Sequence, residues 1–135
     1  MGKILIVDDS RTSRKMLREI LEDMGHEIAG EATNGEEGYV MYKELNPDLV
    51  TLDITMPKMD GIEALMLIKK YNENAEAVMI TAAGQKEKMI QAVKYGASEF
   101  ITKPLKVMRW SVLLHRFWID FSQETKGKIH KIFPF

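Results

Sequence analysis

The chain of 135 residues contains no cysteine, so its sequence excludes disulfide bonds and thiolate metal sites. No apolar run approaches the roughly 18 residues that a membrane-spanning helix needs. The amino terminus shows neither the charged region nor the apolar region of a signal peptide. We therefore expect a cytoplasmic protein that does not enter a membrane.

A strong excess of charge of either sign is also lacking, since the formal net charge is −1. The charge is unevenly spread: six Lys or Arg against two acidic residues after residue 105 make that segment positive. It contains no dense basic run, so we expect no nucleic-acid partner. The content of 45% hydrophobic and 29% charged residues fits a single globular domain with its own core.

Short apolar segments alternate along the chain with segments of helical periodicity. The expected strands are residues 3–7, 27–32, 49–52, 77–81 and 99–102, and a last helix is expected after Pro104. Parallel neighbouring strands need long crossover connections, which helices supply. The pattern therefore predicts an α/β fold with a parallel sheet and helices on both of its faces.

Polar residues stand where these strands end. They are Asp8, Asp9, Asp53, Thr81 and Lys103. In parallel sheets, ligands bind beyond the carboxyl ends of the strands. Each residue alone has an ordinary structural explanation, such as a capping aspartate or a solvated lysine. Their shared place at strand ends favours a functional site instead.

Three carboxylates in one small site repel each other by about 4 kcal/mol per pair at about 4 Å and an effective dielectric near 20. They need a cation or protons, and oxygen-only ligands suit a hard ion such as Mg²⁺. A carboxylate can also act as a nucleophile toward phosphorus. Lys103 and Thr81 could then balance the charge on the phosphoryl oxygens. The residues predict Mg²⁺ and a phosphoryl group at this edge of the sheet.

At this point four stretches resemble a known family. They are ILIVDDS at the first strand, DITMPKMDG around Asp53, ITAAG at Thr81 and KYGASEFITKP ending at Pro104. Together they resemble the receiver domain of two-component response regulators, most closely the single-domain CheY-like type, over residues 1–105. The resemblance implies a doubly wound, flavodoxin-like (CheY-like) (βα)5 fold with five parallel strands in the order 2-1-3-4-5.

The resemblance also implies the residue roles of a phosphorylation switch. Asp53 is expected to accept a phosphoryl group from a histidine kinase or a phosphotransfer domain, in a system of chemotaxis type. The implied ligands of Mg²⁺ (or Mn²⁺) are Asp8, Asp9, Asp53 and the backbone carbonyl of Thr55. The implied phosphoryl-stabilising groups are Thr81, Lys103 and the backbone of Ala82.

The resemblance further implies how such a switch is read out. Thr81 and Phe100 would move together on phosphorylation and change a face formed by the fourth helix, fifth strand and last helix. A downstream protein is expected to bind this face. The Lys103-Pro104 peptide is expected to be cis, which would aim the lysine at the site.

Beyond Leu105 the chain departs from the family, whose last helix is usually amphipathic. Val112, Leu113 and Ile119 exceed the apolar stripe that one docked helix needs. We expect a receiver domain over residues 1–121, with an atypical last helix at 106–121 and an atypical tail at 122–135. The surplus apolar surface favours a homodimer formed through this helix and tail.

Three alternatives stay open. The chain could be the receiver fragment of a larger regulator whose output domain is missing. An aspartyl-phosphate phosphatase of the haloacid dehalogenase type would need a second aspartate where Thr55 stands. A flavodoxin-like cofactor binder would need a phosphate loop where Asp8 and Asp9 would repel a phosphate. We therefore expect a phosphoacceptor regulator that assists its own phosphorylation and dephosphorylation, and no other enzyme activity.

Overall fold

The computed structural model describes residues 2–82 and 84–103. The chain divides into two units, residues 1–104 and 105–135, and the described residues all lie in the first. The expected last helix, the boundary at residue 121, the tail and the Lys103-Pro104 peptide therefore fall outside the described residues. None of the described helices is both long and apolar enough to cross a membrane.

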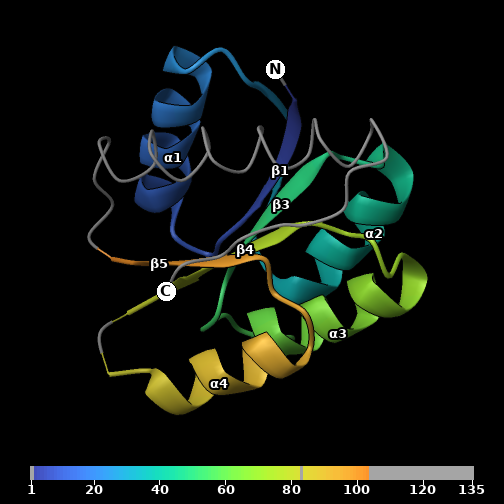
Figure 1. The fold of residues 1–135 in the computed structure, drawn as a ribbon. Coiled ribbons are helices and arrows are strands. Elements are labelled where there is room, and N and C mark those ends of the chain that lie inside the picture. Colours follow the sequence, from blue (N-terminus) through green and yellow to red (C-terminus); the bar gives the residue numbers. More distant parts are fainter. Residues whose placement is uncertain (1, 83, 104–135) are drawn as a thin grey trace, which may run out of the picture. The chain divides into compact units, whose positions relative to one another are not determined.

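Strands and helices alternate strictly along the described chain, as the sequence predicts (Figure 1). They are β1 (Lys3–Val7), α1 (Arg11–Asp23), β2 (Glu27–Ala32), α2 (Gly35–Leu45), β3 (Leu49–Asp53), α3 (Gly61–Tyr71), β4 (Ala77–Thr81), α4 (Lys86–Lys94) and β5 (Glu99–Thr102).

The five strands form one parallel sheet in the order β2-β1-β3-β4-β5, which confirms the predicted fold class and strand order. Figure 1 shows α1 on one side of this sheet and α2, α3 and α4 on the other. Because both faces are covered, the central strands β3 and β4 are buried at every position. The sheet therefore forms a rigid frame, and its strands all end at one edge.

Successive side chains of each strand point to opposite faces of the sheet. Leu5, Val7 and Leu52 belong to the core cluster that the sheet shares with α2, α3 and α4. Leu17, Ile20 and Leu21 form the buried stripe of α1. Burial on both faces fixes the register of each strand, since a shift by one residue would exchange its two faces.

Helix caps fix where the chain leaves the sheet. The Ser10 side chain accepts a hydrogen bond from the Ser13 backbone and so caps α1 two residues after Asp8. Asp60 starts α3 with a capping box, in which Asp60 and Glu63 each accept a hydrogen bond from the other's backbone amide. The loops after β1 and β3 are thereby anchored close to the strand ends.

Candidate functional site

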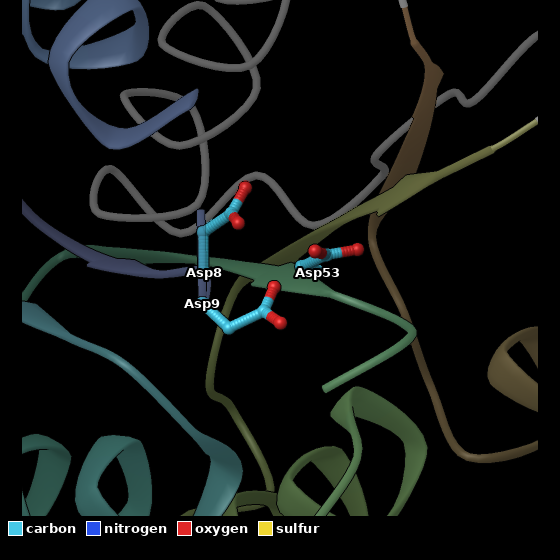
Figure 2. A group of neighbouring side chains, drawn as sticks. All are labelled: Asp8, Asp9 and Asp53. Atoms are coloured by element: carbon cyan, nitrogen blue, oxygen red, sulfur yellow. The ribbon is translucent and has the colours of Figure 1, made fainter. Parts of the chain in front are cut away.

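Three carboxylates meet where β1 and β3 end. Asp8 and Asp9 follow β1 directly, and Asp53 is the last residue of β3. Because Val7 lies beside Leu52 in the sheet, the next residue of each strand comes to the same place. Ligand atoms of Asp8, Asp9 and Asp53 lie within 4.8 Å of one another, and Figure 2 shows their side chains gathered there.

Two of these carboxylates are removed from solvent. Asp8 is 1% exposed and Asp53 is 6% exposed, whereas Asp9 is an exposed residue. Asp8 Oδ1 accepts a hydrogen bond from the Ser10 amide at 2.8 Å. Asp8 Oδ2 is buried and has no hydrogen-bond partner among the described residues. A buried oxygen of this kind is costly unless a cation or a donor satisfies it.

The electrostatics of the site are most visible at Asp53. Burial, followed by the negative charge of Asp8, raises the pKa of Asp53 from 3.8 to about 6. The positive charge of Lys103 and a backbone hydrogen bond from Thr55 act in the opposite direction on this pKa. The fold thus holds the Asp53 carboxylate in a place where it needs further positive charge.

Lys103 supplies part of that charge. It follows β5, and its backbone amide donates to the Thr81 carbonyl at 2.8 Å, which extends the pairing of β4 and β5 by one residue. Its Nζ lies 3.5 Å from Asp8 Oδ2 and 3.5 Å from Asp53 Oδ2. One ammonium group between two buried carboxylates leaves the site with an excess of negative charge.

The donor set fits a hard divalent cation. The side-chain ligand atoms of the cluster are carboxylate oxygens; among the described residues Asp8 Oδ2 has no hydrogen-bond partner, and Asp9 is open to solvent. Mg²⁺ and Mn²⁺ prefer oxygen ligands, and Mg²⁺ typically keeps several waters, for which an exposed side gives room. The cluster therefore fits the predicted divalent cation, and its oxygen ligands suit Mg²⁺ and Mn²⁺ alike.

A family comparison agrees with this geometry. The model of the response regulator receiver domain matches residues 4–113. The chain belongs to this family. It is thus a receiver domain similar to response regulators of two-component signalling.

Relatives of this receiver domain carry chemotaxis names. A chemotaxis protein CheY of Thermotoga maritima is 51% identical over 110 residues, which are 81% of this chain and 92% of that protein. A chemotaxis protein CheY of Halobacterium salinarum is 54% identical over 104 residues, which are 77% of this chain and 86% of that protein.

A solved structure extends the likeness to three dimensions. It is a CheX-CheY-BeF3-Mg complex from Borrelia burgdorferi, with a TM-score of 0.81 and 40% sequence identity. The match covers 86% of this chain and 88% of that one. The family match and these relatives together identify the chain as a CheY-like receiver domain.

The other predicted site residues are placed as follows. Thr81 ends β4, is 1% exposed, and donates its hydroxyl hydrogen to the Ala82 carbonyl at 3.1 Å. Thr55 and Ala82 are exposed in the loops after β3 and β4. Phe100 is 6% exposed and lies in the core cluster, beside Met79 of β4. Thr81 and Phe100 thus occupy neighbouring strands of the receiver domain, with Phe100 two positions before the residue that pairs with Thr81.

Sequence reasoning missed one residue that touches the site. The Arg14 Nη1 atom donates to the backbone carbonyl of Asp8 at 2.8 Å. The available signal was electrostatic: Arg14 stands near the amino terminus of α1, where the helix dipole disfavours a cation. Its acidic partner, Glu31 on β2, lies far from Arg14 in the sequence, so local spacing does not reveal the pair.

Proposed function

We propose that this receiver domain is a phosphorylation-activated switch of a chemotaxis-type two-component system. Asp53 accepts a phosphoryl group from a histidine kinase or a phosphotransfer domain in a Mg²⁺-dependent reaction. The single observation that carries the proposal is the arrangement of Asp53, Asp8 and Lys103, with both carboxylates within 3.5 Å of the ammonium group.

The chemistry proceeds by attack of an Asp53 carboxylate oxygen on the phosphorus of the donor phosphohistidine. The new P–O bond forms as the P–N bond breaks, and the electron pair of that bond stays on the imidazole nitrogen of the donor. Asp53 is stationed for this attack at the end of a fully buried strand. A fixed nucleophile lowers the barrier because its orientation costs no further entropy.

The surrounding residues balance charge on the phosphoryl oxygens. Lys103 Nζ lies 3.5 Å from Asp53 Oδ2, the carboxylate that is to be phosphorylated. After the transfer its ammonium group can pair with an oxygen of the phosphoryl group. The Thr81 hydroxyl turns from the Ala82 carbonyl toward the phosphoryl group, and the Ala82 amide donates beside it. Asp8, Asp9, Asp53 and the Thr55 carbonyl would hold a Mg²⁺ or Mn²⁺ ion, and the bound ion would supply positive charge to the reacting oxygens.

The readout proposed is a change in the face that includes α4 and β5. Reorientation of Thr81 frees space near β5, into which the Phe100 side chain moves. Ile90 and Val93 of α4 are 50% and 55% exposed and supply apolar surface for a downstream protein. The homodimer through residues 106–135 and the cytoplasmic location remain predictions from the sequence.

We treat the chain as a phosphoacceptor regulator and not as a phosphatase of added substrates. A haloacid dehalogenase-type phosphatase uses a second aspartate as general acid, and Thr55 stands at that position, exposed and without a carboxyl group. Turnover of a generic phosphomonoester should therefore be absent.

The proposal is tested by ¹⁹F NMR with beryllofluoride, a mimic of the phosphoryl group, added with and without Mg²⁺. We expect a bound resonance only when Mg²⁺ is present, and we expect its loss in Asp53→Ala. Thr51→Val is the matched control, because Thr51 is a fully buried neighbour on β3 whose hydroxyl has no hydrogen-bond partner among the described residues. Binding that survives in Asp53→Ala would contradict the proposal.

A further inference from the structure

Arg14 connects the acidic loop to a neighbouring strand. It lies in the first turn of α1, and its side chain is only 14% exposed. Nη1 donates to the Asp8 carbonyl at 2.8 Å, while Nε donates to Glu31 Oε1 at 3.1 Å. A single guanidinium group in the first turn of α1 therefore contacts both the residue after β1 and a residue near the carboxyl end of β2.

Three of the four polar groups of Asp8, its backbone amide, its carbonyl and Oδ1, form hydrogen bonds within the fold. Its backbone amide donates to the Ala32 carbonyl at 3.0 Å, and its Oδ1 accepts from the Ser10 amide at 2.8 Å. Arg14 occupies its carbonyl oxygen. The remaining atom, Oδ2, is the one aimed at Lys103 Nζ and at the carboxylate cluster. Among the described residues, Arg14 is thus the side chain that holds the Asp8 backbone from outside the loop.

Glu31 keeps Arg14 in place. It lies on β2 beside Ile6, two residues before Asp8 on the adjacent strand. Its second oxygen, Oε2, accepts from Arg18 Nε at 2.7 Å. A carboxylate bonded by two guanidinium groups one helical turn apart has little freedom, so it presents Arg14 in one orientation.

Helix stability alone does not account for an arginine at this position. The amino-terminal turn of a helix carries partial positive charge and disfavours a cation, and α1 has no acidic residue in its first turn to offset this. An aliphatic or acidic residue would serve the helix better. The position of Arg14 is instead explained by what its guanidinium group contacts.

We propose that Arg14, anchored by Glu31, is a positioning residue for the metal-binding carboxylates Asp8 and Asp9. This inference rests on the proposed function, because it assumes that these carboxylates hold a divalent cation. Partners that orient metal ligands in this way commonly account for 10–100-fold in metal affinity, so we expect about a tenfold loss without Arg14.

The sign of the effect separates positioning from simple electrostatics. A positive charge near a cation site repels the incoming ion, so removal of Arg14 should strengthen Mg²⁺ binding if its charge were its only influence. Loss of positioning should weaken Mg²⁺ binding instead. Arg18→Ala is the matched control, because Arg18 shares Glu31 with Arg14 but makes no hydrogen bond to Asp8 among the described residues.

The experiment is a calorimetric titration of Mg²⁺ alone into wild type, Arg14→Ala, Arg14→Lys and Arg18→Ala. We expect the dissociation constant to rise about tenfold in Arg14→Ala and to change much less in Arg18→Ala, which leaves the bonds of Arg14 to Asp8 and to Glu31 in place. Arg14→Lys keeps the charge but cannot hold Asp8 and Glu31 with one planar group, so its dissociation constant should also rise. Urea unfolding establishes that each variant is folded, and Arg14→Lys decides the question if Arg14→Ala does not fold.

Two results would overturn the inference, and they are distinguishable. If wild type binds no Mg²⁺, the proposed function fails and the inference fails with it. If wild type binds Mg²⁺ while both Arg14 variants bind it as tightly as Arg18→Ala does, only the positioning role fails. Hydrogen exchange of the Ser10 amide gives a metal-free readout, because its bond to Asp8 Oδ1 should open more often in the Arg14 variants than in the Arg18 control.

Discussion

Asp53 shows how the fold prepares a reactive group at a cost to its own stability. Burial and the neighbouring charge of Asp8 raise the pKa of Asp53 to about 6. Since the native pKa lies above the ordinary value of 3.8, the native state binds the proton more tightly than the unfolded state does. The stability contributed by this group is therefore fully present below about pH 4 and is lost as the pH rises through 6.

Replacing Asp53 with asparagine should stabilise the metal-free protein at neutral pH, because the amide carries no charge to bury. The gain should be roughly 1 to 3 kcal/mol at pH 8 and small at pH 4.5. Urea unfolding of wild type and Asp53→Asn at both pH values, in the presence of a chelator, measures the difference. Equal gains at the two pH values would show that repulsion at Asp53 is not the cause.

Gly61 is a second residue whose identity follows from the site. A Cβ atom placed on it would lie 2.2 Å from the Asp53 carbonyl oxygen, which is backbone and cannot move aside cheaply. The Gly61 amide also donates to the Ile54 carbonyl at 2.9 Å, so the start of α3 is tied to the segment that follows the acceptor.

Gly61→Ala should therefore destabilise the protein by more than about 2 kcal/mol, despite the better helix propensity of alanine. It should also weaken beryllofluoride binding, because the Asp53 backbone must shift to admit the methyl group. Urea unfolding and ¹⁹F NMR measure the two effects. An unchanged free energy of unfolding would contradict the close approach of the Gly61 and Asp53 backbones.

At the scale of elements, local sequence patterns predicted strands and helices well where burial is on both faces. The segments 3–7, 27–32, 77–81 and 99–102 appear as strands with those bounds, and in 3–7 and 77–81 a nearly continuous apolar run admits few alternatives. Met16 shares the helical spacing of the buried stripe of α1 but is 43% exposed. The stripe is narrower than spacing alone suggests, since only part of α1 faces the sheet.

Contacts between distant segments could not be read from local patterns. Gly38 lowers the helix propensity of α2, yet a Cβ there would lie 2.8 Å from both γ carbons of Val7. The glycine allows close packing of α2 on β1. The Arg14–Glu31 pair depends in the same way on which side chains of α1 and β2 meet, and strand order alone does not specify that contact.

The capping box of α3 gives a prediction at the element scale. Asp60→Ala removes the side-chain acceptor of the Glu63 amide and should cost about 1 kcal/mol in unfolding free energy. Asp60→Asn keeps an acceptor and should cost less. The ion pair of Asp60 with Lys88, at 3.7 Å and partly exposed, should contribute little to this loss. Similar losses in both variants, measured by urea unfolding, would count against the capping role.

At the scale of the whole molecule, the parallel sheet explains why the site could be predicted in part. Once the five strands are parallel, residues at their carboxyl ends must meet, which brings Asp8, Asp53 and Lys103 together from across the sequence. The roles of Thr55, Ala82 and Phe100 came from the family resemblance alone and remain proposals. The expectations for residues 104–135 have no described structure to compare with.

Binding of Mg²⁺ should raise the stability of the whole domain by mass action. At a concentration 100-fold above the dissociation constant, the gain should be about 2.7 kcal/mol, since the unfolded chain does not assemble the three carboxylates. Asp9→Asn should lose most of this gain while leaving metal-free stability nearly unchanged, because Asp9 is exposed. Thermal unfolding at increasing Mg²⁺ concentrations measures both. A midpoint that does not depend on Mg²⁺ in wild type would argue against the metal site.

The central claim is that Asp53 is the phosphoacceptor and that a divalent cation is required. Intact mass spectrometry after incubation with acetyl phosphate tests it most directly, with wild type and Asp53→Ala each treated with and without Mg²⁺. The account predicts a mass increase of one phosphoryl group in wild type with Mg²⁺ and no increase in the other three samples. An adduct that forms without Mg²⁺, or one that persists in Asp53→Ala, would contradict it.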